Sequence, residues 1–231
     1  MTSEFKRGIR SALPTGLGYL GVGMAFGVIA VAAGLAVWQV FIMSLLVYAG
    51  AGQFALVGLL VTGEPLSSIA LTIFLINLRN FLMALHTATF FPDVSAGRSL
   101  AIGGLLTDET YGLLLTEGLQ KKAVSSDWML GNNILSYCSW IAATVLGAVV
   151  GERIPDPQVL GLDFALMAMF IGIFAAQFRG LALSVPVKKI AGILLTVASV
   201  FFVLACFLPK SVAVLSATLA GCVMGVWLDE N

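Results

Sequence analysis

Residues 74–86 read FLINLRNFLMALH, an apolar run that contains Asn77, Arg79 and Asn80. The residues before them, back to Ala70, are also mostly apolar, and a further apolar run follows. This composition is typical of a helix that crosses a lipid bilayer, where a charge at the centre costs about 2.5–3.5 kcal/mol. We therefore expect Arg79 to face the interior of the protein and to pair with an acidic group there.

The composition of the whole chain agrees with a membrane location. Of its 231 residues, 59% are hydrophobic and only 10% are charged, whereas about 25% of the residues of a soluble domain are charged. We therefore predict an all-α integral membrane protein, multi-pass in the cell inner (plasma) membrane and surrounded by the lipid bilayer. The formal net charge is zero, so no nucleic-acid partner is expected.

Cysteine and histidine usage predicts neither a metal site nor a cofactor. The three cysteines lie within apolar runs without paired spacing, and His86 is the only histidine, so a zinc site made by the protein alone is not expected. No Gly-rich loop is followed by Lys and Ser or Thr, which argues against an ATPase. No serine has an obvious base partner, so we do not expect an enzyme.

Eight hydrophobic segments are long enough to cross a bilayer, which requires about 20 mostly apolar residues. The predicted spans are 16–37, 40–61, 67–91, 100–119, 130–150, 159–178, 190–208 and 211–228. Connections between them are short, so we expect a single membrane transporter domain, residues 1–231. The N-terminal segment is similar to a signal peptide, but it lacks a convincing cleavage site, and we interpret it as a retained first helix.

The distribution of Lys and Arg favours both termini in the cytoplasm. With that orientation, eight spans place Lys6, Arg7, Arg10, Lys121, Lys122, Arg179, Lys188 and Lys189 inside, and Arg98, Arg153 and Lys210 outside. The span 100–119 is the weakest of the eight, because it contains three acidic residues. If it were re-entrant, most of the inside cations would move outside, so we expect a true crossing.

A short internal repeat suggests a duplication. AGAGQF (49–54) in the second span resembles FAAQF (174–178) in the sixth. Four crossings apart, the two segments would have the same orientation, as in a parallel 4+4 duplication. A chance match between two Gly- and Ala-rich segments is the alternative.

Acidic residues in the fourth predicted span are the candidate partners of Arg79. Asp108 and Glu109 lie near its middle, and three intramembrane charges of this kind leave one negative charge over. A proton, a metal cation or the ammonium group of a substrate could neutralise that charge. We favour Asp108 as the partner of Arg79 and Glu109 as the group that carries a proton; the alternative is an ion pair that only fixes helix packing.

The second span contains four small residues in a row, Ala49 to Gly52, flanked by Tyr48 and Gln53. Each glycine in a helix costs roughly 1 kcal/mol relative to alanine, and a helix break inside a membrane is tolerated only where it lines a cavity or contacts protein. One interpretation is a discontinuous helix that binds a small polar ligand, with Gly50 and Gly52 contributing backbone groups. Close helix packing is the alternative, as predicted for the GxxxG pairs Gly23–Gly27, Gly147–Gly151 and Gly221–Gly225.

Five motifs together resemble the AzlC-type family, the large subunits of two-component branched-chain amino acid exporters. They are GVGMAFGVIA (21–30), MSLLVYAGAGQFALVGLL (43–60), NLRN (77–80), LLTDET (105–110) and LGLDFALMAMF (160–170). The resemblance implies export of valine, leucine, isoleucine or related amino acids, a short AzlD-type membrane partner of about four helices, and coupling to the proton gradient. It adds Asp163, in the last motif, to the candidate site. Family members usually carry His after NLR, where this chain has Asn80.

A secondary transporter subunit is therefore the leading hypothesis. A zwitterionic amino acid needs donors for its carboxylate, an acceptor for its ammonium group and an apolar pocket for its side chain. An assembly subunit without transport activity and an ion channel lined by Gln53, Asn77 and Asn80 are the alternatives.

Overall fold

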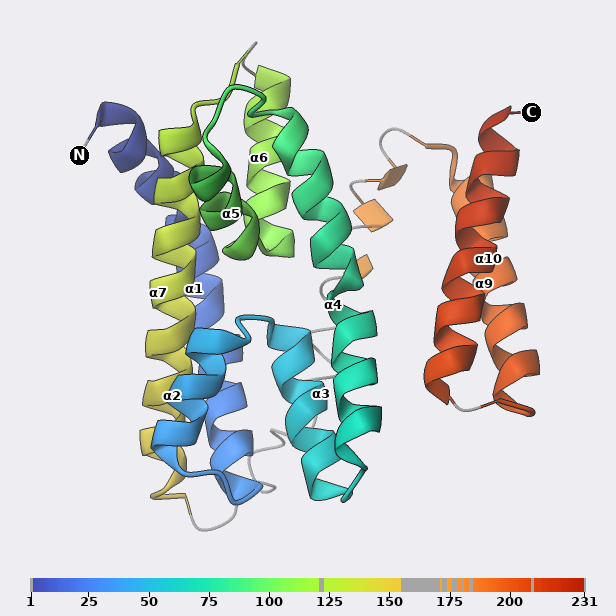
Figure 1. Cartoon of the computed structure of the whole chain (residues 1–231), viewed down its shortest axis with the longest axis horizontal. Coiled ribbons are helices and arrows are strands. Elements are labelled where there is room, and N and C mark those ends of the chain that lie inside the picture. The colour runs from blue at the N-terminus through green and yellow to red at the C-terminus, as the bar shows by residue number, and fades with distance from the viewer. Residues whose placement is uncertain are drawn as a thin grey trace. The chain divides into compact units, whose positions relative to one another are not determined.

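The computed structural model of the chain describes residues 2–120, 123–154, 185–208 and 210–230, with a few positions between 171 and 182 (Figure 1). Within these residues, every regular element is an α-helix, as predicted. The helices are α1 (Ser3–Ala32), α2 (Val37–Leu46), α3 (Gly50–Val61), α4 (Leu66–Thr89), α5 (Ala96–Gly104), α6 (Asp108–Gln120), α7 (Ser126–Gly151), α9 (Val187–Ala205) and α10 (Lys210–Glu230). They fall into two units, Met1–Met167 and Ala168–Asn231, which are described separately.

In the first unit, α1 and α7 form a parallel pair in backbone contact. A methyl group on Gly8 would collide with the carbonyl of Trp128, and one on Gly27 with the carbonyl of Thr144. The contacting residue numbers increase together along both helices, so the two helices run in the same direction. The close approach predicted for the GxxxG pairs of these two helices is confirmed.

The predicted span 40–61 is not a single crossing, which corrects the sequence-based expectation. It is broken after α2, and Tyr48 in the break has a φ of 36°. The amide of Gln53 donates to the hydroxyl of Ser44 over 3.0 Å, whereas nine residues of continuous helix would separate them by about 13.5 Å. The chain therefore reverses, and α2 and α3 form a re-entrant hairpin in which each helix is about half the bilayer core in length.

The predicted span 100–119 is also wrong as a crossing, and it forms a second re-entrant hairpin, α5–α6. Arg98, at the start of α5, pairs with Asp127 at the start of α7. Glu117, near the end of α6, pairs with Arg7 near the start of α1 at 2.6 Å. Both open ends of this hairpin therefore lie at the end of the unit that carries the N-terminus.

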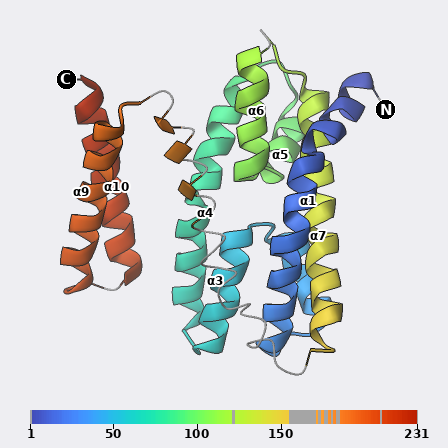
Figure 2. The same cartoon turned by 180° about the vertical axis from the view of Figure 1, so that it is seen from behind.

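The two hairpins enter the unit from opposite ends and their breaks meet near mid-height, as both views show (Figures 1 and 2). α1 is followed by the α2–α3 hairpin from one end, and α4 is followed by the α5–α6 hairpin from the other. This order, a long helix followed by two half-helices, occurs twice with inverted direction. Two of the five residues of the segment 174–178 lie outside the described residues, so the parallel 4+4 duplication remains an untested prediction.

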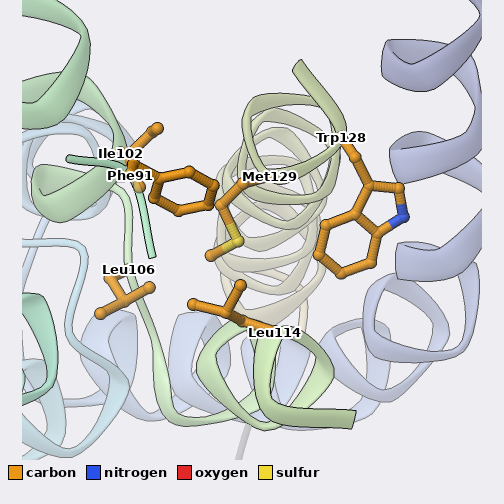
Figure 3. Packing of buried hydrophobic residues seen from close by; sticks show 6 residues of the cluster. All are labelled: Phe91, Ile102, Leu106, Leu114, Trp128 and Met129. Carbon is orange, nitrogen blue, oxygen red and sulfur yellow. The ribbon is translucent and has the colours of Figure 1, made fainter. Parts of the chain in front are cut away.

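A buried apolar cluster holds the α5–α6 hairpin against α7 (Figure 3). Its members come from α5, α6 and α7, from the turn after α4 and from the connection between α5 and α6, and they are Phe91, Ile102, Leu106, Leu114, Trp128 and Met129. Leu114 and Met129 have no exposed surface, and Trp128 has 1%. The half-helices are thus fixed by side-chain packing on one side of α7.

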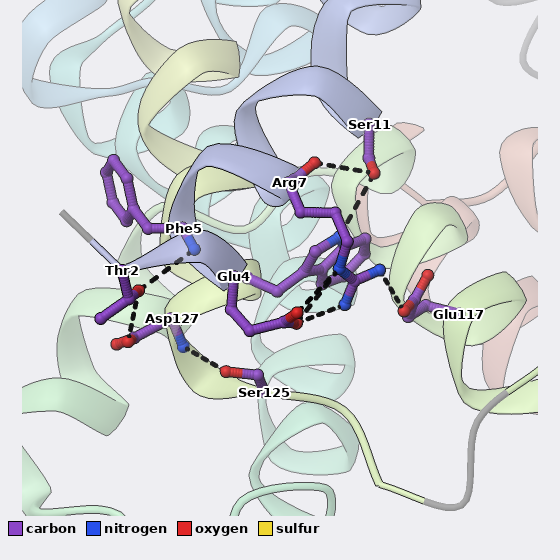
Figure 4. Close-up of polar contacts among 9 residues, drawn as sticks. Thr2, Glu4, Phe5, Arg7, Ser11, Glu117, Ser125 and Asp127 are labelled. Atoms are coloured by element: carbon purple, nitrogen blue, oxygen red, sulfur yellow. Dashed lines mark hydrogen bonds and ion pairs between the residues drawn. The ribbon is translucent and has the colours of Figure 1, made fainter.

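Polar contacts fasten the same hairpin at the N-terminal end of the unit (Figure 4). The guanidinium of Arg7 bonds Glu4 and Glu117 and lies 5.7 Å from the ring centre of Trp128. Thr2 donates to Asp127 over 2.7 Å. These contacts join the first turns of α1 and α7 to the last turn of α6.

The second unit contains the antiparallel helices α9 and α10. Gly221 on α10 faces Val197 on α9, and Lys189 near the start of α9 donates to the carbonyl of Leu228 near the end of α10. These helices agree with the predicted spans 190–208 and 211–228, while 159–178 lies mainly outside the described residues. Among those residues, α1, α4, α7 and α9 are long and apolar enough to cross a membrane. The positions of the termini and the single-domain organisation remain predictions.

Candidate substrate site

The first turn of α6 places two carboxylates at the break of the α5–α6 hairpin. Thr107 caps this helix: its hydroxyl accepts from the backbone N–H of Thr110 at 3.3 Å, and the Thr110 hydroxyl accepts from the backbone N–H of Thr107 at 2.9 Å. This reciprocal cap starts the helix just before Asp108 and Glu109. The positive end of the helix dipole favours these charges by about 0.3–1 kcal/mol each.

Arg79, in the middle of α4, pairs with Asp108 as the sequence predicts. Its Nη2 lies 2.8 Å from Asp108 Oδ2, with side-chain exposures of 40% for Arg79 and 17% for Asp108. The Nε of Arg79 is buried and makes no hydrogen bond within the described residues. The guanidinium therefore keeps donor capacity beyond the ion pair, in the planar arrangement that suits a second carboxylate.

Glu109 turns away from Arg79 and accepts a hydrogen bond of 2.7 Å from the hydroxyl of Tyr19 on α1. The hydroxyl oxygen of Tyr19 also lies 2.9 Å from the hydroxyl oxygen of Thr107. Glu109 is exposed, and it forms no ion pair among the described residues. The predicted surplus of one negative charge near the α6 break is thus assigned to Glu109.

The N-terminus of α3 lies against α4. A methyl group on Gly52 would be 3.3 Å from the side-chain nitrogen of Asn77, and one on Gly50 would be 3.1 Å from the indole of Trp140. Asn77 thus contacts α3 next to the break between α2 and α3. Arg79, two residues further along α4, pairs with Asp108 next to the break between α5 and α6. The NLRN segment of α4 brings the two breaks into one site.

The side chain of Gln53, a predicted ligand-binding residue, makes hydrogen bonds within the protein instead. It is fully buried, donates to Ser44, and accepts 2.7 Å from the indole N–H of Trp140. Its amide closes the α2–α3 hairpin onto α7, which makes its role here one of positioning the break.

Tyr48 and Asn80 present polar atoms that the described part of the chain does not satisfy. Tyr48 is 7% exposed, and neither its hydroxyl nor the side-chain oxygen of Asn80 makes a hydrogen bond. A non-glycine residue with positive φ costs about 1–3 kcal/mol, and here the ring of Tyr48 packs edge-on against Tyr137 with centroids 4.7 Å apart. The break is therefore held in a strained form beside unsatisfied polar groups.

Asp163 falls outside the described residues. His86, the single histidine of the chain, lies about two turns beyond Arg79 on α4, where its Nδ1 is 2.7 Å from the hydroxyl of Tyr111 on α6.

Several residues of α7 hold the half-helices next to the breaks, and these residues were not predicted from the sequence. Asn133 donates 2.9 Å to the carbonyl of Ile102, and Tyr137 donates 2.7 Å to the carbonyl of Leu45. Both acceptors belong to the last turns of the half-helices α5 and α2, where carbonyls have no partner within the helix. The two adjacent asparagines at 132–133, inside an apolar span, were the feature of the sequence that could have indicated them.

A family model described as AzlC protein matches residues 14–154, more than half of the chain. The chain belongs to the AzlC family. The matched segment runs from the first half of α1 to the end of α7, and it includes every predicted site residue except Asp163. The AzlC family is one of membrane transport proteins and not of enzymes.

Relatives of this AzlC-family chain occur in bacteria and archaea. A membrane protein of Archaeoglobus fulgidus is 31% identical over 235 residues, covering 99% of this chain and 97% of that protein. Inner membrane protein YgaZ of Escherichia coli is 28% identical over 183 residues, covering 77% and 75%. Branched-chain amino acid transport protein AzlC of Bacillus subtilis is 23% identical over 177 residues, covering 76% and 68%. No solved structure matches the chain.

Proposed function

We propose that this chain is the large subunit of a secondary transporter that exports branched-chain or similar small apolar amino acids across the cell inner membrane. The observation that carries the proposal is the meeting of two helix breaks at Arg79, which pairs with Asp108 and retains free donor capacity. The relative from Bacillus subtilis is named as a branched-chain amino acid transport protein. Broken helices that meet inside a membrane are typical of transporter substrate sites.

The chemistry of the site suits a zwitterion. The substrate carboxylate would be held by Arg79 together with the backbone N–H groups at the start of α3, which begins at Gly50. The substrate ammonium would be balanced by Glu109, whose carboxylate has no basic partner in the described residues. Exposed apolar side chains beside these groups would contact the aliphatic part of the substrate.

We further propose that protons drive the export and that Glu109 carries them. Asp108 is held by Arg79, whereas the partner of Glu109 among the described residues is the neutral hydroxyl of Tyr19. Protonation of Glu109 therefore removes the surplus charge without breaking the ion pair. Asn80, in place of the family's usual histidine, contributes no titratable group.

The orientation and the partner complete the proposal. Lys6, Arg7, Arg10 and Arg98 lie at the end of the unit that carries the N-terminus, and Arg153 lies at the other end. This distribution supports a cytoplasmic N-terminal end. We expect the small AzlD-type subunit to be required for activity, as the family resemblance implies.

Counterflow in proteoliposomes tests the proposal. Vesicles loaded with unlabelled leucine and containing this chain with its small subunit should take up labelled leucine from outside, because a carrier exchanges substrate. Vesicles with the Arg79→Leu variant are the matched control and should not exchange. An ion channel would pass ions without exchanging leucine, and an assembly subunit would do neither; each of these results would contradict the proposal.

A further inference from the structure

The middle of α7 carries three polar side chains that are fully buried: Asn132, Asn133 and Ser136. We call them the α7 oxygen cluster. Ser136 follows Asn133 by three residues and Asn132 by four, and residues at these spacings are neighbours on a helix surface, with Cβ atoms about 5–6 Å apart. The three side chains therefore form one patch on one face of α7.

The hydrogen bonds of the cluster leave its oxygens without partners. Both asparagine side chains donate through nitrogen to backbone carbonyls of the second hairpin, Asn132 to Thr110 at 3.3 Å and Asn133 to Ile102 at 2.9 Å. A carbonyl can only accept, so these bonds fix which end of each amide is the nitrogen. The Oδ1 atoms of both asparagines and the Oγ of Ser136 are buried and make no hydrogen bond with the described residues.

The surroundings of the cluster favour positive charge. Asn133 bonds the last turn of α5, so the cluster lies beside the C-terminal end of that half-helix, where the helix dipole is negative. Asn132 bonds Thr110 in the first turn of α6, where the helix dipole is positive but where Asp108 and Glu109 supply negative charge. Glu109 has no basic partner in the described part of the chain. The three orphaned oxygens and the negative end of α5 therefore point to a cation, and the α6 carboxylates offset the positive end of α6.

We propose that the α7 oxygen cluster binds a sodium ion, which stabilises the α5–α6 hairpin on α7. The ligands are neutral hard oxygens, and they include no thiolate or imidazole of the kind that transition metals select. They also include no carboxylate, which calcium and magnesium sites normally use. Carbonyls at the ends of broken helices are a recurrent means of holding sodium in membranes. The proposal does not depend on which substrate the protein transports.

Thermal unfolding of the purified wild-type protein in detergent tests the sodium site. Sodium chloride is titrated against choline chloride at constant ionic strength, and the unfolding midpoint is followed. A ligand that binds the folded state raises the midpoint as its concentration exceeds the dissociation constant, so we expect a saturable rise with sodium. Ser136→Ala should raise the half-saturating sodium concentration at least tenfold.

Ser139→Ala is the matched control, because Ser139 lies on the same helix but its hydroxyl lies against Gly16 of α1; this variant should respond to sodium as the wild type does. Ser136→Cys nearly preserves the shape of the side chain but offers a soft sulfur, so it should raise the half-saturating sodium concentration as the alanine variant does. It replaces that variant if Ser136→Ala fails to fold. The proposal is overturned if the wild-type midpoint is insensitive to sodium, if potassium raises it equally, or if both Ser136 variants keep the wild-type response. If leucine instead of sodium raised the unfolding midpoint, and both Ser136 variants lost this effect, the cluster would be assigned to the substrate ammonium group. That result would also overturn the sodium proposal.

Discussion

The Arg79–Asp108 pair can be separated into its structural and functional parts by a double-mutant cycle. Arg79→Leu leaves Asp108 charged and mostly buried without a cation. Breaking a fully buried pair costs about 3–5 kcal/mol, and an exposed pair contributes about 0–1 kcal/mol. Because Arg79 is 40% exposed and Asp108 only 17%, we expect a loss of folding free energy between these limits, about 1–3 kcal/mol.

The second change, Asp108→Asn, removes the orphaned charge, so the double variant should recover most of the lost stability. It should not recover leucine exchange, because neither leucine nor asparagine can bind the substrate carboxylate as the guanidinium does. Arg79→Lys should restore exchange only in part, since an ammonium cannot make two parallel hydrogen bonds to a carboxylate.

Two measurements on the same preparations decide the question: the unfolding midpoint in detergent and counterflow of labelled leucine in proteoliposomes, each normalised to inserted protein. If exchange returned together with stability in the double variant, the pair would serve helix packing alone. Normal exchange by a well-inserted Arg79→Leu variant would refute the reasoning more directly.

Three further predictions concern coupling, packing and topology. Glu109→Gln should still exchange internal for external leucine, because exchange needs no net proton movement, but at a higher half-saturating leucine concentration, because the amide oxygen carries no charge to balance the substrate ammonium. It should lose uphill export driven by a pH gradient; uphill export at the wild-type rate would exclude Glu109 as the proton carrier. Gly27→Ala should reduce the yield and the unfolding midpoint of the inserted protein, since overpacking costs typically about 1–3 kcal/mol and here the methyl group meets the α7 backbone. Gly21→Ala, with nothing within 4 Å of the added methyl group, should be tolerated, and equal behaviour of the two variants would contradict the described α1–α7 contact. With the N-terminus cytoplasmic, a membrane-impermeant maleimide added outside intact cells should label Glu64→Cys and not Asp93→Cys; the reverse result would favour eight continuous spans.

The ion pair could be predicted from the sequence because buried charge is costly and the chain offers few partners for it. Arg79, Asp108 and Glu109 stand out against apolar surroundings, and pairing followed from that contrast. The break near Gly50 was also indicated, since consecutive small residues support a helix poorly. These are properties of short segments, which the sequence displays directly.

The re-entrant hairpins could not be predicted in the same way, because hydropathy reports how apolar a segment is and not which way it runs. Two half-helices and one full crossing have the same composition. Local signals existed: Thr107 and Thr110 have the spacing of a helix cap, and this cap divides the predicted span 100–119. Reading these two residues as a helix start would have required giving capping more weight than charge distribution.

Tyr19 and the polar residues of α7 were missed for a different reason. Their importance comes from partners far away in the chain, such as Glu109 for Tyr19 and Ile102 for Asn133. A single sequence does not show these pairings. Only the parallel approach of α1 and α7, with the hairpins between them in sequence, brings them together.

The parallel pairing of α1 with α7 also bears on how the protein is made. α1 is the first helix to leave the ribosome, yet the surface that receives its glycines belongs to a helix synthesised after all five of the helices between them. Until α7 is inserted, Gly8 and Gly27 have no α7 backbone to pack against. During that time α1 is surrounded by lipid or by the insertion machinery. Contacts between segments so distant in sequence form late, because a long loop must close first. The helix that enters the membrane first is therefore among the last to reach its final packing.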